Sequence, residues 1–213
     1  MSYFIPHPNP HPIHQLIEAR RSINHFDPQC QLDDQQIEML VDLATRSPSA
    51  FNLQNWQFIA VRSQPHKQRL QQLSFGQQKV ADAAVTFIVC GVRNGYQALA
   101  SVLAGSVEQG AIPAALADSW VAIASATQHE QPQAQRDEAI RSASLAAMTL
   151  MLAAEGMGLG SCPMTGFDHD ALIEEFALGD ELIPVMLVTV GRPLASNWAQ
   201  KPRKPLQQVL TVV

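Results

Sequence analysis

The spacing of hydrophobic positions along the chain predicts helices that alternate with a few short strands. Apolar residues recur at helical spacing from Ile13 to Arg21. A second helix follows Asp33, which stands in capping-box register with Gln36. This helix should end before Ser47-Pro48, because the residue before a proline disfavours helical backbone angles. Its expected buried stripe consists of Ile37, Leu40, Val41 and Ala44.

The rest of the chain continues this pattern. Short runs rich in β-branched residues predict strands at residues 57–61, 85–92 and 184–190. Longer periodic segments predict helices at residues 65–73, about 96–128 with a break at Pro113, 136–157, and from the N-cap Asp168 through 176, with a loop at 131–133. The glycine-rich segment 156–161 fits a helix C-cap and tight turn, because a dinucleotide fingerprint needs a strand before its glycines and a helix after them.

The segment between the second helix and the first strand carries distinctive polar chemistry. Hydroxyl and carboxamide groups stand here beside two aromatic side chains, in the set Ser47, Ser49, Phe51, Asn52, Gln54, Asn55 and Trp56. Such groups can surround an anion or the edge of a polar ring, while the aromatics form an apolar wall. The mixture suits a planar, heteroatom-rich ligand. A capped loop is the simpler alternative, because Ser, Asn and Pro are common in turns.

Two further segments concentrate cations. Arg20 and Arg21, followed by Ser22 and Asn24, could bind an anion and an amide edge, although a basic helix end that complements the helix dipole is an equally good interpretation. Near the other end, residues 201–205 place three cations among prolines.

The final residues, 206–213, have strand-like composition. An exposed apolar strand favours aggregation unless something pairs with it, so we expect pairing with a partner subunit.

Composition narrows the class of protein. The 213 residues are 46% hydrophobic, which predicts a single domain with a full core behind a proline-rich extended arm at residues 1–12. A net charge of −5 without a basic stripe argues against a nucleic-acid surface. No apolar run is long enough to span a membrane and no signal peptide opens the chain, so the cytoplasm is the expected location. The low charge of residues 98–126 indicates burial in a homodimer interface.

Metal and disulfide chemistry have little support in the sequence. His7, His11 and His14 lie close together, but no carboxylate or cysteine joins them, so a solvated arm is preferred to a metal site. The three cysteines show no paired spacing that would indicate disulfides or zinc: Cys30, Cys90 and Cys162.

Taken together, the motifs resemble the nitroreductase family of FMN-dependent oxidoreductases over residues 13–213. The resemblance is carried, in order, by Arg20-Arg21-Ser22-x-x-x-Phe26, Ser47-Pro48-Ser49-x-x-Asn52-x-Gln54-x-Trp56, Gly158-Leu159-Gly160-x-x-Pro163-Met164-x-Gly166-Phe167, Gly191-x-Pro193 and Lys201-x-Arg203. It implies an α+β, three-layer α-β-α fold with a central mixed sheet flanked by helices, in an intertwined homodimer with C-terminal strand exchange. It also implies hydride transfer from NADH or NADPH to FMN and on to nitroaromatics, quinones or similar small-molecule acceptors, by a ping-pong mechanism.

The resemblance also implies roles for individual residues. The FMN phosphate, ribityl chain and pyrimidine edge would meet Arg20, Arg21, Ser22 and Asn24, and the phosphate would be clamped by Lys201 and Arg203. The other subunit would line the flavin with Pro48, Ser49, Ala50 and Asn52, in the loop that also carries Gln54. Lys79 would lie near the flavin's polar edge, and the isoalloxazine would run beside Pro163, Met164, Thr165 and Gly166. Because the chemistry belongs to the flavin, we assign no catalytic side chain and no metal.

Three positions bear on the acceptor and on the flavin. Asn24 stands where many members of the family have Lys or Arg, which could lower the flavin's reduction potential or be offset by Lys79. Asn55 replaces the proline that usually precedes the tryptophan, so a less rigid loop is expected. Phe51 would narrow the acceptor pocket.

Two alternative functions stay open. One is dehalogenation or dehydrogenation of a specific metabolite on the same scaffold, and the other is a low-turnover dimer that sequesters flavin.

Overall fold

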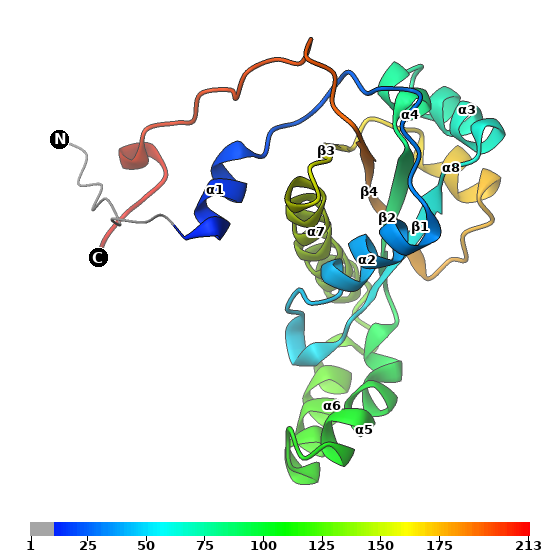
Figure 1. Ribbon diagram of the computed structural model, residues 1–213. Helices are drawn as coiled ribbons and strands as arrows, with labels where there is room; N and C mark the ends of the chain where they lie inside the picture. Colours follow the sequence, from blue (N-terminus) through cyan, green and yellow to red (C-terminus); the bar gives the residue numbers. More distant parts are fainter. Residues whose placement is uncertain (1–10) are drawn as a thin grey trace.

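A four-stranded sheet forms the middle layer of the computed structural model, which describes residues 11–213 (Figure 1). The strands lie in the order β1 (Trp56–Val61), β2 (Val85–Val92), β4 (Leu182–Gly191) and β3 (Gly160–Met164). All three ladders are antiparallel. β2 and β3 run in the same direction, but β4 lies between them, so they do not pair with each other. The mixed sheet that we expected is therefore corrected to an antiparallel one, with a parallel bridge between Ser22 and Ser161 beside it.

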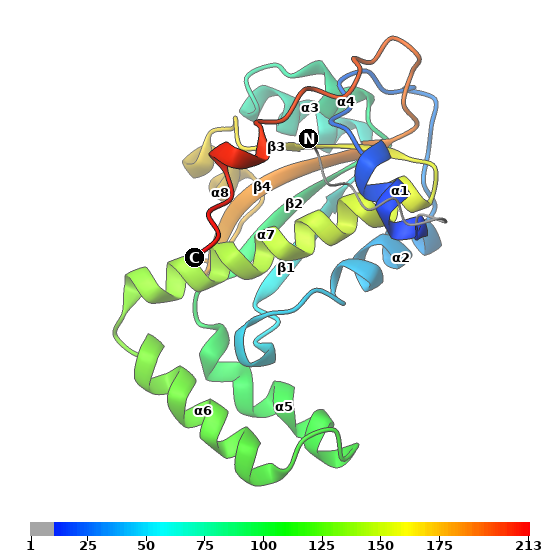
Figure 2. The ribbon, with the colours of Figure 1, turned by 90° about the vertical axis from the view of Figure 1, so that its left-hand side faces the viewer.

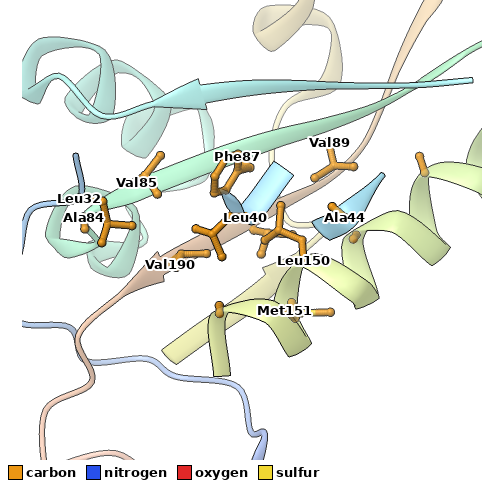
Figure 3. Close-up of a cluster of buried hydrophobic side chains, with 14 of the residues drawn as sticks. Leu32, Leu40, Ala44, Ala84, Val85, Phe87, Val89, Leu150, Met151 and Val190 are labelled. Atoms are coloured by element: carbon orange, nitrogen blue, oxygen red, sulfur yellow. The ribbon is translucent and has the colours of Figure 1, made fainter. Parts of the chain in front are cut away.

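Helices cover both faces of this sheet. One face packs against α2 (Asp34–Ala44) and α7 (Pro132–Gly156), and Figure 3 shows Leu40 and Leu150 of these helices meeting Phe87 of β2. The other face carries α3 (Gln64–Leu73), α4 (Gln78–Asp82) and α8 (His169–Glu175). This arrangement is the expected three-layer α-β-α fold.

The remaining helices project from these layers. A short 3₁₀ turn, Gly95–Ala98, leads into α5 (Leu99–Glu108), and α6 (Ala114–Gln128) returns beside it below the sheet (Figure 2). Helix α1 (Pro12–Ala19) buries none of its residues, and Ile17 is about half exposed. Within the described part of the chain, no helix is long and apolar enough to cross a membrane.

Local signals in the sequence set most element boundaries. Asp33 and Gln36 form the expected capping box, with both reciprocal hydrogen bonds present. The expected loop at 131–133 is wrong, because Pro132 begins α7, and proline is compatible with the first helical position, where no intrahelical N–H bond is lost. Of the expected arm at residues 1–12, the first ten lie outside the described residues and Pro12 begins α1.

The C-terminal segment differs from its expected conformation. Within one chain, residues 206–213 form no strand: Leu206–Gln208 is a 3₁₀ turn, and the last residues lack regular structure. All eight residues are exposed. A strand needs a neighbour to accept its backbone hydrogen bonds, and this segment has none among residues 11–213.

Gly91 of β2 allows α7 to approach the sheet closely. A Cβ at this position would lie 2.4 Å from the carbonyl oxygen of Ala139, whereas a Cβ at Gly105 in α5 would have no neighbour within 4 Å. We expect Gly91→Ala to lower the free energy of unfolding by about 1–3 kcal/mol through overpacking. Gly105→Ala, as a matched control, should raise it by up to about 1 kcal/mol through helix propensity. Chemical denaturation of both variants checks the pair, and equal effects would contradict the close approach.

Candidate functional site

The C-terminal tail meets the end of α1 around a cationic pocket. A cavity of about 70 Å³ is lined by Arg20, Arg21, Ser22, Trp198, Ala199, Gln200, Lys201 and Arg203. The Gln200 side chain donates a hydrogen bond to the Arg20 carbonyl at 2.9 Å. Lys201 lies 5.4 Å from the centre of the Trp198 ring, in cation–π range. Cations that are about 180 residues apart in the sequence thus line one pocket.

One carboxamide, which the sequence analysis did not single out, fastens the tail in this position. The Asn197 side-chain oxygen accepts hydrogen bonds from the backbone N–H groups of Asn24 at 2.7 Å and His25 at 3.0 Å. Its amide donates to the carbonyls of His25 and Leu194. The three bonds to Asn24 and His25 hold the chain that leads from β4 to the cations beside residues 20–25, and the bond to Leu194 fixes the turn within the tail.

Two buried polar atoms near this pocket lack partners. Nη1 of Arg20 and Oγ of Ser161 have no hydrogen bond among the described residues. Leaving a buried donor unsatisfied costs about 1–3 kcal/mol, and more for a charged group. An anionic, hydrogen-bonding ligand in the pocket would satisfy Arg20, so these residues fit a phosphate-bearing group.

A second polar cluster lies between the segment after α1, helix α4 and strand β3. The Lys79 ammonium donates a hydrogen bond to the Asn24 side-chain oxygen at 3.0 Å and lies 3.6 Å from the Cys162 sulfur. The backbone N–H of Ile23 donates to the carbonyl of Ser161 at 2.9 Å, which places the segment after α1 directly against β3. The structure thereby brings Asn24 and Lys79 to the start of the run Pro163–Gly166.

That run continues past the end of β3. Pro163 is half-buried and Met164 is buried, whereas Thr165 and Gly166 are exposed. The Gln77 side chain donates to the Gly166 carbonyl at 3.0 Å, so the segment just before α4 also holds the end of this run. The expected residues of the first helix end, Lys79, β3 and the tail therefore occupy one contiguous region.

The polar loop after α2 has a strained backbone. It contains a 3₁₀ turn, Ala50–Asn52, and positive φ angles at Phe51 (53°), Asn52 (60°) and Gln54 (48°). Ser49 Oγ accepts a hydrogen bond from the Gln54 backbone N–H at 2.9 Å. Left-handed geometry at non-glycine residues costs free energy, and such strain clusters at binding and active sites.

Packing against the α5–α6 pair supports this loop. Leu53 is buried beside α5 and α6, and the Phe51 ring lies 6.2 Å from that of Trp120. Asn55, expected to loosen the loop, is 3% exposed and is anchored instead by hydrogen bonds with Val92 through its backbone carbonyl and its side-chain amide. Packing against α5 and α6, together with the hydrogen bonds of Asn55, thus holds the loop that carries Phe51 in place.

Within one chain, this loop does not join the other candidate residues. It lies next to α5 and α6, on the far side of the molecule from residues 20–24 and the tail (Figures 1 and 2). The structure therefore brings together Arg20, Arg21, Ser22, Asn24, Lys79, Pro163, Met164, Thr165, Gly166, Lys201 and Arg203, and leaves apart Pro48, Ser49, Ala50, Phe51, Asn52 and Gln54.

The fold and this region define an α+β protein with a cationic cradle at one end of an antiparallel sheet. The family model for the nitroreductase family matches residues 17–192. YodC of Bacillus subtilis, an NAD(P)H nitroreductase by name, is 31% identical over 196 residues, covering 92% of this chain and 96% of YodC. The chain belongs to the nitroreductase family.

Solved structures agree with this assignment. The crystal structure of ydfN from Bacillus subtilis, a nitroreductase by name, superposes with a TM-score of 0.88 at 31% identity, covering 95% of this chain and 99% of that one. A nitroreductase from Exiguobacterium sibiricum, solved in complex with FMN, gives a TM-score of 0.88 at 26% identity, covering 94% and 97% of the two chains.

Proposed function

We propose that this protein is an FMN-dependent oxidoreductase that takes hydride from NADH or NADPH and reduces nitroaromatics, quinones or similar acceptors in a ping-pong cycle. The observation that carries the proposal is the cationic pocket with its buried Arg20 nitrogen, which has no hydrogen-bond partner among residues 11–213. FMN combines a phosphate with a planar ring that has polar edges, and the polar cluster around Lys79 lies next to the same segment of chain. The FMN complex of the Exiguobacterium relative supports this choice of cofactor.

The phosphate would be held by the four cations of the pocket: Arg20, Arg21, Lys201 and Arg203. A phosphomonoester carries about −1.5 to −2 charge near neutral pH. Guanidinium groups match phosphate geometry with paired, charge-assisted hydrogen bonds. The phosphate would thereby link the tail to the end of α1.

The ring would lie beyond the phosphate, along β3. Ser22, Asn24 and Lys79 would meet its polar edge, and the run Pro163–Gly166 would lie beside its face. Bound FMN supplies the hydride chemistry, while these residues bind it, orient it and exclude water around it.

A second copy of the chain would complete the site with the strained loop, residues 48–54. Apolar side chains that a lone chain exposes support such an assembly: Met39 and Leu43 on α2, and Leu145 and Met148 on α7. These two helices pack against each other, so the exposed positions can form one surface. Phe51 would then face the acceptor side of the partner's flavin.

The C-terminal segment would cross to the same partner. β1 is an edge strand whose outer side is unpaired among residues 11–213. A cavity of about 290 Å³ follows this edge, and its apolar lining includes Ile59, Val61 and Phe176. Residues 206–213 of a second chain could add a strand there and bury their apolar side chains.

The absorbance spectrum of the purified protein tests the proposed function. We expect the visible bands of oxidised flavin, and we expect NADH or NADPH to bleach them under anaerobic conditions, with a nitroaromatic or quinone restoring them. Dithionite is the control that bleaches any bound flavin. Bands that persist with both nicotinamides but bleach with dithionite would indicate a sequestering protein. A colourless protein that FMN does not reconstitute would contradict the cofactor itself.

A further inference from the structure

We infer that Cys162 is a positioning residue, which together with Asn24 fixes the Lys79 ammonium so that this single cation raises the reduction potential of the bound flavin. The inference rests on the proposed function, since it requires FMN beside Lys79. It assigns a role to a thiol that the family motifs leave out. The argument begins with the contacts of the ammonium.

Lys79 receives its two contacts from separate parts of the chain. Asn24 follows α1, and its side-chain oxygen lies 3.0 Å from Nζ; Cys162 is in β3, and its sulfur lies 3.6 Å from Nζ. An ammonium group has three N–H donors, so one remains for a ligand. Two acceptors at fixed positions define the direction of that third donor.

The charge of Lys79 is not neutralised by either contact. Neither acceptor is a carboxylate, and no ion pair in the described region involves Lys79. Asp82, one turn further along α4, accepts a hydrogen bond from Gln78. A full positive charge is therefore held at the polar cluster.

Cys162 is itself held rigidly. Its side chain is buried, and its carbonyl accepts a hydrogen bond at 3.3 Å from Thr189 Oγ1 of the neighbouring strand. The thiol lies 3.7 Å from the Pro163 carbonyl, to which it can donate while its sulfur accepts from Lys79. Cys162 thus connects the ammonium to the first residue of the run Pro163–Gly166.

A fixed cation near the flavin's polar edge stabilises the negative charge that the ring gains on reduction. The reduction potential should therefore rise with how well Lys79 is positioned. Asn24 supplies one of the two acceptors that orient this cation. Loss of either acceptor would let the ammonium move away from the ring and toward solvent, where its field is weaker.

The midpoint potential of bound FMN, measured by equilibration with a reference dye, tests the inference. For Cys162→Ala we expect about a tenfold shift of the equilibrium toward oxidised flavin, which is about 30 mV for a two-electron couple. Cys162→Ser keeps an acceptor and should stay near wild type. Lys79→Met should shift the potential further than Cys162→Ala, and adding Cys162→Ala to Lys79→Met should have no further effect.

Cys90→Ala is the control for packing, because Cys90 is a buried thiol in the same hydrophobic cluster but makes no contact with Lys79. Asn24→Ala provides a second route if Cys162→Ala does not fold, and it should lower the potential in the same direction. The inference would be overturned if Cys162→Ala shifted the midpoint potential equally in the wild-type and Lys79→Met backgrounds. It would also be overturned if Cys90→Ala shifted the potential as far as Cys162→Ala does. Unchanged potentials in both acceptor variants would overturn it as well. A wild-type protein without bound FMN would instead overturn the proposed function.

Discussion

Replacing Arg20 and Arg203 together with alanine is expected to yield protein that purifies largely without FMN. Both guanidiniums line the cationic pocket, and one nitrogen of Arg20 is buried with no partner in the described part of the chain. A hydrogen bond to a charged group contributes roughly 1.5–3 kcal/mol. Loss of two such interactions predicts that FMN affinity falls by about 100-fold or more. Flavin absorbance relative to protein absorbance, followed by titration of the apoprotein with FMN, measures this loss.

The double variant separates binding from folding. Arg20 Nη1 makes no internal hydrogen bond among the described residues, so its removal should cost the apoprotein little stability. The matched control removes two cations elsewhere, Arg46 and Arg69, which make exposed pairs with Asp42 and Glu175. This control has the same net charge as the test variant and should remain yellow. A fully yellow Arg20→Ala/Arg203→Ala protein would show that the phosphate binds elsewhere.

The elements that the sequence could predict are those with strong local signals. The capping box of α2 and the apolar runs of β2 and β4 depend on neighbouring residues, and the structure confirms them. β3 carries no such signal. It contains Gly160 and Pro163, and it becomes a strand only because β4 offers a hydrogen-bonding edge. Proline is tolerated there because β3 is itself an edge strand.

The charges of the candidate site were predictable from composition, and its geometry was not. The arginines after α1 and the cations of the tail stand out in the sequence, but only the family resemblance, and nothing in composition, predicted that they meet one phosphate. That outcome depends on Asn197, a single carboxamide that joins the tail to Asn24 and His25 through three hydrogen bonds. The positive φ angles of Phe51, Asn52 and Gln54 were equally hidden, since none is a glycine.

The separation of the strained loop from the cationic pocket also limits what one chain can do. If the site needs both, its assembly depends on whatever joins two copies. The C-terminal segment is suited to that role. Its apolar residues are exposed in a single chain, including Leu206, Val209, Leu210 and Val212. The tail also carries Lys201 and Arg203 of the pocket, so a dimer contact made by residues 206–213 would be linked to cofactor binding through the same segment.

Deleting residues 206–213 is therefore expected to dissociate the proposed dimer and to release the proposed FMN cofactor. Full burial of an apolar side chain contributes about 1.5–3 kcal/mol, and part of the total is offset by the cost of ordering the segment. A net loss of about 4 kcal/mol would raise the dimer dissociation constant about 1,000-fold. Sedimentation velocity across a range of protein concentrations measures this change, and flavin absorbance reports the cofactor in the same samples.

A charge-only variant of the same segment provides the control for the deletion. Gln207→Glu/Gln208→Glu keeps every apolar residue of the tail, and it should leave a yellow dimer because the proposed contact is made by the apolar side chains rather than by the polar positions. Deletion protein that stays dimeric would show that the interface does not need residues 206–213. Deletion protein that is monomeric yet retains FMN would show that one chain suffices for the cofactor, which would contradict the role proposed for the strained loop.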